Sequence, residues 1–142
     1  MKKAVYFSLA LILFGLASAE NAFACSCVAS PDPAETQIRA AFSNSEAIFS
    51  GKVVEIKESP ADPTRMIVRI KLAHSWKGSA KREIFISTAK ESSMCGYLFQ
   101  VGQKYLVYAN QNKNDLWVQN CSRTAVFSDK GDANYLSKLK RR

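Results

Sequence analysis

Four cysteines constrain this chain more than any other feature of its 142 residues. They are Cys25, Cys27, Cys95 and Cys121, and all of them follow an N-terminal segment that has the character of an export signal. An even number of cysteines in an exported chain is typical of disulfide bonds. The first two are separated by a single residue and are too close to pair comfortably with each other. Each is therefore expected to bond to one of the last two, and the spacing alone leaves both cross-arrangements open.

Residues 1–24 are predicted to form a signal peptide. Lys2 and Lys3 give a positive start, an apolar stretch runs from Leu9 to Leu16, and Ala22-Phe23-Ala24 is an A-x-A cleavage site. The apolar stretch is too short for a membrane-spanning helix, which needs about 20 residues. We therefore expect residues 25–142 to form a soluble domain that is secreted or periplasmic and has no membrane span.

Cleavage after Ala24 would make Cys25 the first residue of the exported chain. Its free amine and its carbonyl would then lie side by side, held in place by the disulfides, and together they would form a two-point metal chelator. Two alternatives would block the amine. Ala17-Ser18-Ala19 is a second cleavage site, and cutting there would leave the residues from Glu20 to Ala24 in front of the first cysteine. Lipidation of Cys25 would have the same effect.

Alternating apolar residues predict a mainly β domain with a helix near each end. The first helix is expected to begin at Asp32-Pro33-Ala34-Glu35, with Asp32 as its cap, and to end near Asn44. The second is expected to begin at Asp132, again as a cap. Period-two alternation predicts strands over residues 47–56, 65–76, 83–88, 104–109 and 116–119.

The predicted strands also suggest how the core is built. Ser50-Gly51 is expected to form a bulge or bend in the first strand. Val68, Ile70 and Trp76 are expected on one apolar face of the second strand, with His74 beside the tryptophan as a packed or rim residue. At this length, five strands with flanking helices favour an OB-like, closed five-stranded antiparallel barrel in a single domain.

The sequence predicts no enzyme and no cofactor. His74 is the only histidine, and there are no paired carboxylates, no nucleophile elbow and no phosphate-binding loop. The Cys-x-Cys spacing differs from the C-x2–4-C pairs that are usual in zinc sites. Pro31-Asp32 separates the two cysteines from the helix start, whereas redox cysteines usually lie at a helix N-terminus.

The net charge of +8 does not by itself indicate a nucleic-acid partner. The lysines and arginines are spread along the strands, which favours a solvated face over a nucleic-acid site. Tyr105, Tyr108 and Trp117 are expected to be core residues of alternating strands and not platforms for stacked bases. We expect a monomer that binds no nucleic acid.

Four stretches of the chain form an ordered set. They are Cys25-Ser26-Cys27 directly after the signal, Trp76-Lys77-Gly78, Glu91 to Tyr97, and Cys121-Ser122 followed by a helix that ends at Arg141-Arg142. The set resembles the N-terminal, netrin-like domain of the tissue inhibitors of metalloproteinases. The chain resembles a single-domain, bacterial-type member, without the third disulfide of this domain and the second cysteine-rich domain that animal members usually carry.

This resemblance implies a disulfide pairing and a binding edge. The pairs would be Cys25–Cys95 and Cys27–Cys121, in an OB-like five-stranded barrel. The inhibitory edge would combine two segments, which are Cys25, Ser26, Cys27 and Val28 in the first and Ser92, Ser93 and Met94 in the second. Ser26 would point into the primary specificity pocket of a protease, and Val28 and Met94 would supply apolar contacts around it.

The sequence therefore predicts a secreted inhibitor of zinc metalloendopeptidases, with a zinc metalloprotease as its partner. A catalytic zinc in such an enzyme keeps three protein ligands and one open position. The main-chain amine and carbonyl of Cys25 would chelate the metal at that position. The alternative is a non-inhibitory netrin-like module whose basic surface binds an anionic glycan or another protein.

Overall fold

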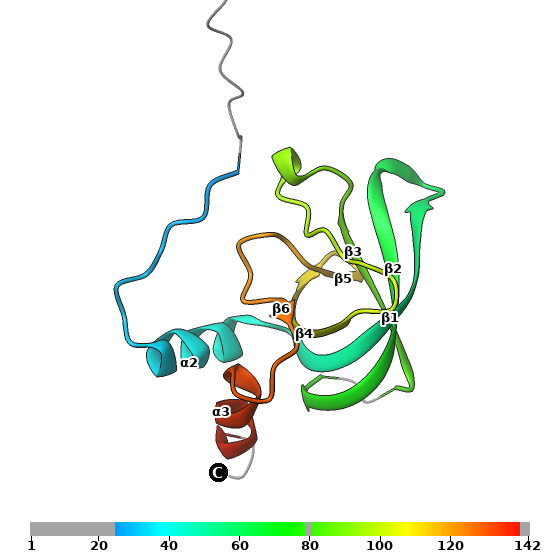
Figure 1. The fold of residues 1–142 in the computed structure, drawn as a ribbon. Helices are drawn as coiled ribbons and strands as arrows, with labels where there is room; N and C mark the ends of the chain where they lie inside the picture. The colour runs from blue at the N-terminus through cyan, green and yellow to red at the C-terminus, as the bar shows by residue number, and fades with distance from the viewer. Residues whose placement is uncertain (1–24, 79–80, 140–142) are drawn as a thin grey trace, which may run out of the picture.

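The computed structural model describes residues 25–78 and 81–139 (Figure 1), so the predicted signal peptide and the end of the chain at Arg141-Arg142 lie outside the described residues. The elements in chain order are α2 (Ala34–Asn44), β1 (Ala47–Ser59), β2 (Asp62–Lys77), β3 (Glu83–Ala89), the 3-10 turn η1 (Ser92–Met94), β4 (Lys104–Asn112), β5 (Asp115–Trp117), β6 (Ala125–Val126) and α3 (Asp132–Leu139). The prediction of a mainly β fold with flanking helices is confirmed.

Five strands pair in a ring. The hydrogen-bonded order is β1-β2-β3-β5-β4, β4 pairs with β1 to close the ring, and β6 adds to the outer edge of β4. β3 and β5 run parallel and meet at one residue pair, Ser87 and Trp117. The expected antiparallel arrangement is therefore wrong at this one contact. Strand direction alternates between antiparallel neighbours, so a closed ring with an odd number of strands must contain a parallel pair.

β1 and β2 form a long, irregular hairpin. Their register shifts between Ser50 and Gly51, so the predicted bulge is confirmed. Glycine is required there because a Cβ atom at Gly51 would lie 2.5 Å from Ile70 Cγ2 and 2.6 Å from the Lys71 carbonyl oxygen. The missing side chain lets the two strands approach closely where the hairpin bends.

The ring has an apolar core inside and a second core outside, under the helices. Phe49, Val68, Ile70 and Val107 belong to the inner core. The outer core contains Ile38, Ile48, Trp76, Leu106, Tyr108, Ala133 and Leu136, and Figure 1 shows α2 and α3 together on one side of the ring. Tyr105 and Tyr108 are 3% and 2% exposed, so their prediction as core residues is confirmed.

Trp76 does not share a face with Val68 and Ile70. Register shifts in the β1–β2 hairpin move it to the outer core, against α3, where its Nε1 donates to Ser137 Oγ at 3.0 Å. His74 is exposed, and its ring centroid lies 4.5 Å from that of the tryptophan. The strand alternation predicted the wrong face because each bulge adds a residue and reverses the order of faces beyond it.

The helix caps were predicted incorrectly. The N-cap of α2 is Pro33, and no side chain caps the helix. The carboxylate of Asp32 instead accepts a hydrogen bond from Ser30 Oγ at 2.9 Å. Asp132 lies in the first turn of α3, and its carboxylate is hydrogen-bonded to Arg123 and Tyr108. Neither helix in the described part of the chain is long and apolar enough to cross a membrane.

Candidate functional site

Two disulfides hold the N-terminal segment on the ring. Cys25 is bonded to Cys95 and Cys27 to Cys121, and the Cα atoms of each pair are 5.3 Å apart. This is the arrangement that the family resemblance implies, out of the two that spacing leaves open. No cysteine among the described residues is free. Residues 25 and 27 are therefore fixed to two segments that are distant in sequence.

The two segments that receive these disulfides lie side by side. Asn120 N donates to the Cys95 carbonyl oxygen at 2.8 Å, and Gly96 and Gln119 form an isolated antiparallel bridge. This contact lies beyond the ends of β3 and β5, the parallel pair that completes the ring. Because its two partner cysteines are neighbours in space, the tripeptide Cys25-Ser26-Cys27 can bond to both at once.

The segment from Ser92 to Gly96 is a tight turn with several backbone hydrogen bonds. Met94 N and Gly96 N both donate to the Glu91 carbonyl oxygen, at 3.1 and 3.0 Å. Cys95 adopts a left-handed conformation with φ of 62°. A Cβ atom at Gly96 would collide with the backbone oxygen atoms of Ala89 and Glu91, so only glycine fits. The turn therefore holds Cys95 in place for its disulfide.

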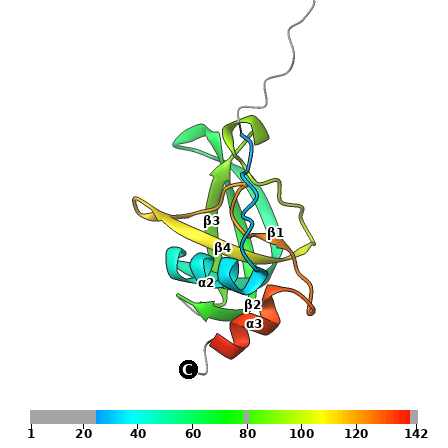
Figure 2. The same ribbon diagram turned by 90° about the vertical axis from the view of Figure 1, so that its left-hand side faces the viewer.

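The side chains that the sequence assigned to a binding edge are largely exposed. Val28 is 96% and Met94 45% exposed, and Ser26, Cys27, Ser92 and Ser93 are exposed as well, while Cys25 is half-buried. The Cys25–Cys95 disulfide brings the first segment against the second, and both views show the start of the chain beside η1 (Figures 1 and 2). The disulfide thus joins the start of the N-terminal arm (residues 25–33) to the turn, while Val28 lies further along the arm and lines a pocket with Gln37 and Arg123.

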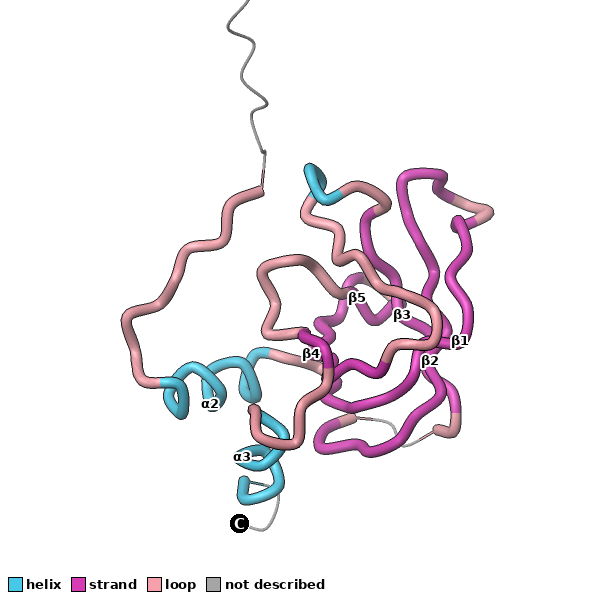
Figure 3. Tube along the Cα trace, in the orientation of Figure 1, coloured by secondary structure: helices cyan, strands magenta, loops and turns pink. Residues whose placement is uncertain are grey.

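The extended arm connects this turn to α2. Residues 25–33 have no regular secondary structure and run from the η1 end of the molecule to the start of the helix (Figure 3). The side-chain nitrogen of Gln37, Nε2, donates to the main-chain carbonyl oxygen of Asp32 at 2.7 Å and to that of Ser30 at 3.3 Å. The side chain of Gln37 therefore holds the lower half of the arm against the helix.

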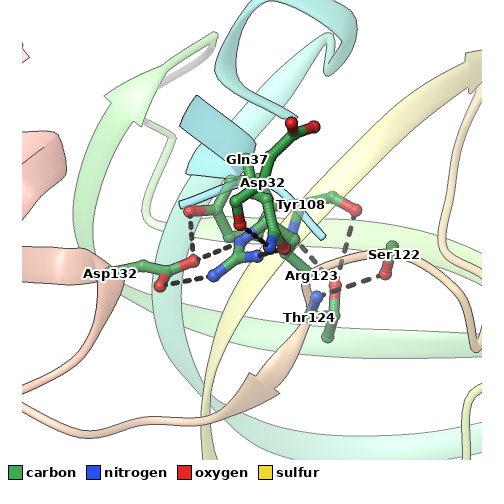
Figure 4. A network of polar contacts seen from close by, with 7 residues as sticks. All are labelled: Asp32, Gln37, Tyr108, Ser122, Arg123, Thr124 and Asp132. Atoms are coloured by element: carbon green, nitrogen blue, oxygen red, sulfur yellow. Dashed lines mark hydrogen bonds and ion pairs between the residues drawn. The ribbon is translucent and has the colours of Figure 1, made fainter. Parts of the chain in front are cut away.

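Arg123 orients that glutamine. Its Nη1 donates to Gln37 Oε1 at 2.9 Å, while Nε and Nη2 donate to the two carboxylate oxygens of Asp132 at 2.7 and 2.9 Å (Figure 4). Tyr108 donates its hydroxyl proton to Asp132 at 2.9 Å. This network joins β4, α2, α3 and the segment after Cys121, and it ends on the carbonyl groups of the arm.

The electrostatics of the network indicate a structural role. Burial, with a further contribution from the Asp132 carboxylate, raises the pKa of Tyr108 above its usual range. The hydrogen bond to Asp132 raises the pKa of Arg123. The tyrosine therefore stays protonated and the arginine charged at neutral pH, so neither group exchanges a proton as an acid–base catalyst does.

A family model described as tissue inhibitor of metalloproteinase matches residues 23–137. The chain belongs to the tissue inhibitor of metalloproteinase family. No curated protein matches it. Membership suggests metalloproteinase inhibition and a metalloproteinase as partner. Members of this family are secreted inhibitors and not enzymes.

No sequence pattern in this domain indicated a role for Arg123 or Gln37. They are 86 positions apart, and neither stands in a motif. The closeness of Arg123 to Cys121 was the one signal available, since a residue next to a disulfide lies near the N-terminal arm. Within residues 25–78 and 81–139, no three His, Cys, Asp or Glu residues group as a metal site.

Proposed function

We propose that this chain inhibits zinc metalloendopeptidases by placing the main-chain amine and carbonyl of Cys25 on the catalytic zinc. The observation that carries the proposal is the double anchorage of the first three residues of the domain. Cys25 and Cys27 are both bonded to neighbouring segments, and the residue between them is exposed. Signal cleavage after Ala24 is the step that would free the amine.

The chemistry follows from the open coordination position of a catalytic zinc. An α-amino group has a reference pKa of about 7.7–8.0, so part of the population is neutral at pH 7 and can donate its lone pair. Zinc favours this ligating form further, since binding a metal displaces a proton. The Cys25 carbonyl oxygen would complete a five-membered chelate ring and displace the water that the protease uses for hydrolysis.

The disulfides would contribute by preorganisation. A free chain terminus loses conformational entropy when it is fixed in an active site, and a terminus that is already fixed does not. The tight turn from Ser92 to Gly96 supports this, because it leaves Cys95 little freedom to move its partner. The arm is restrained at its other end by Gln37.

Side chains of the arm and the turn would supply the remaining contacts. We propose that Ser26 enters the primary specificity pocket and that Val28 and Met94 cover apolar surface beside it, with Ser92 and Ser93 at the margin. The exposure of Val28, at 96%, supports this role, since a large apolar side chain so far out of the core is available to a partner. Serine is small and fills a pocket weakly, which suggests broad and modest affinity.

The topology supports an OB-like, netrin-type domain as the scaffold. The ring order β1-β2-β3-β5-β4, closed by β1–β4, fits the OB-like five-stranded barrel expected from the sequence. In this arrangement the two disulfides lie where β3 and β5 end, so the binding segments are loops on a rigid sheet.

The test compares two N-termini of the same protein. One form begins at Cys25, verified by intact mass and N-terminal sequencing, and the other carries one additional alanine before Cys25. Both are assayed against a panel of zinc endopeptidases. The proposal expects inhibition by the first form and a loss of at least about 100-fold with the second, because the amine becomes an amide.

A matched control adds the alanine after Arg142 and should leave inhibition unchanged. Equal inhibition by both N-terminal forms would refute chelation through the amine while leaving inhibition itself intact. An absence of inhibition by the form that begins at Cys25, across the whole panel, would count against the proposed function.

A further inference from the structure

The edge of β3 that faces β5 is unpaired over its first half. β3 pairs with β2 along its whole length, but with β5 only at Ser87. In an antiparallel pair, alternate residues direct their N–H and C=O groups to the same neighbour. The hydrogen bond from Leu72 N to the Arg82 carbonyl oxygen shows that the even-numbered residues from Arg82 onward bond to β2. The N–H and C=O groups of Glu83 and Phe85 therefore point to the side where no described strand pairs with them.

This edge lacks the usual protection of an exposed strand. Natural proteins cover such edges or interrupt them with proline, lysine or a bulge. β3 itself contains no proline, no lysine and no register shift against β2. Phe85 is 54% exposed, and the carboxylate of Glu83 is already bonded to Arg69 at 3.1 Å. Free backbone groups beside an exposed aromatic ring form a surface to which an extended chain adds as a further strand.

An apolar cavity of about 250 Å³ lies beside the same edge. It is lined by Ala47, Ile84, Phe85, Leu116, Lys81 and Glu83. A cavity of about 150 Å³ is large enough for benzene, so this one has room for a leucine side chain. Ala47 and Ile84 belong to the inner core, and Leu116 packs against it. An apolar side chain placed here would therefore extend the core of the ring.

The charge beside this cavity is positive. Lys81 forms no ion pair with any described residue, whereas Glu83 is paired with Arg69. Residues two positions apart in a strand share a face, so a segment can place one apolar side chain in the cavity and a carboxylate near Lys81. A second copy of this chain suits the site poorly, because its net charge is +8 and two copies repel each other.

We propose that an extended, acidic segment of a partner protein adds to β3 as a strand along Glu83 and Phe85. Its backbone bonds to the free N–H and C=O groups of these two residues. One of its apolar side chains fills the cavity, and a carboxylate lies near Lys81. Two independent features support this occupant, since the backbone pattern specifies an extended chain and the lining of the cavity specifies its side chains.

This surface is distant from the segment that carries Cys25. β3 runs from Glu83 to Ala89, and η1 follows at Ser92. At about 3.3 Å per residue, the start of β3 lies roughly 20 Å from the end that leads into η1. The partner segment and a protease can therefore be bound at the same time, and the inference does not depend on the proposed inhibition.

The test uses the mature protein and a capped synthetic peptide, Thr-Asp-Thr-Leu-Thr-Asp-Thr, whose leucine and carboxylates share one face of a strand. Binding is followed by NMR of the backbone amides. Solvent exchange of the Glu83 and Phe85 amide protons should slow by at least about tenfold, whereas that of Ile84, whose N–H already faces β2, should not change. Unchanged exchange at Glu83 and Phe85, or no binding at about 1 mM peptide, would overturn the proposal.

Modified peptides test the strand and the cavity separately. One is N-methylated at the leucine and another at the threonine after it, and adjacent N–H groups in a strand point to opposite sides. One of these two peptides should lose binding while the other keeps it, and equal affinities would rule out strand addition. Replacing the leucine by alanine should weaken binding by about tenfold, because less apolar surface enters the cavity. An unchanged affinity would contradict the role of the cavity.

The variant Lys81→Glu tests the charge, with Lys138→Glu as a control that makes the same change on α3. An exposed ion pair is worth a factor of roughly two to three, and reversal replaces attraction by repulsion. The first variant should bind the peptide about fivefold more weakly and the control less than about twofold. Equal losses would show that net charge alone explains binding. A dimer in sedimentation that the peptide dissociates would overturn the assignment of this edge to an acidic partner.

Discussion

Replacing Arg123 by alanine tests whether the polar network holds the N-terminal arm. The substitution removes two hydrogen bonds to the Asp132 carboxylate, at 2.7 and 2.9 Å, and one to Gln37 Oε1, at 2.9 Å. The ion pair is only partly accessible, with side-chain exposures of 29% for the arginine and 18% for the aspartate. The carboxylate keeps one described donor, the hydroxyl of Tyr108.

The magnitude follows from these three bonds. Charge-assisted hydrogen bonds contribute about 1.5–3 kcal/mol when buried, and partial exposure reduces this to about 1 kcal/mol each. Arg123→Ala should therefore lower the free energy of unfolding by about 3 kcal/mol. Only the bond to Gln37 restrains the arm. Its loss should reduce the free energy that holds the arm in place by about 1 kcal/mol, which corresponds to about fivefold weaker inhibition.

Urea unfolding measures the first quantity. For a slope of about 1.5 kcal/mol per molar, the midpoint should fall by about 2 M without a change in slope. Hydrogen exchange over residues 28–37 measures the second, and it should become faster there than in β1. Arg69→Ala is the matched control, since it also breaks two ion pairs but has no contact with the arm.

Two results would contradict this reasoning. If Arg123→Ala shifts the urea midpoint no more than Arg69→Ala does, the network does not stabilise the packing of the helices and the arm on the strands. If exchange over residues 28–37 is unchanged although the midpoint falls, the network stabilises the helices without positioning the arm. Arg123→Lys should give an intermediate midpoint, because one ammonium group cannot bond to both partners in the same geometry.

Three further outcomes are expected. Because the pKa of Tyr108 is raised in the folded protein, its contribution to stability is complete below a pH of about 10, which is the pKa of tyrosine in the unfolded chain, and is lost as the pH rises further. Tyr108→Phe should therefore reduce the decline of the urea midpoint at alkaline pH. An unaltered decline would show that the tyrosine is not its source. Gly96→Ala should cost more than about 2 kcal/mol, because the Cβ meets two backbone oxygen atoms, whereas Gly131→Ala, whose nearest neighbour is 3.6 Å away, should cost little; similar melting temperatures would refute the steric argument. The double substitution Cys25→Ala and Cys95→Ala removes a disulfide whose cysteines are 70 positions apart, and it should lower the free energy of unfolding by about 4 kcal/mol. Inhibition, measured where this variant is still folded, should fall sharply, and full potency would exclude a role for preorganisation.

The sequence was most informative where a single residue type determines the structure. Cysteine chemistry predicted two disulfides, but spacing could not distinguish the two pairings, because that choice depends on which strand ends meet in space. The resemblance implied the pairing that the structure contains. Gly51 marked the bulge because only glycine allows the close approach of β2.

Predictions failed where distant contacts override local pattern. Trp76 changes face because the bulges depend on the pairing of β1 with β2, which alternation within β2 alone does not reveal. Asp32 was expected as a cap from its position before Pro33, yet its carboxylate turns toward Ser30. Arg123 joins a helix and an arm near the opposite end of the chain, and no local window contains both partners.

The short pairing between β3 and β5 gives the tripeptide Cys25-Ser26-Cys27 a further structural role. We call this pairing the seam of the ring. These strands share one register pair, so the ring is least continuous there. Beyond the seam, Cys95 and Cys121 lie on opposite sides, and Cys25-Ser26-Cys27 connects them covalently. A protease that cut a peptide bond between Cys25 and Cys27 would release nothing, because each new chain end would stay bonded to its own side of the seam. In the proposed complex, the segment would therefore remain attached to the domain even if the protease cut it as a substrate.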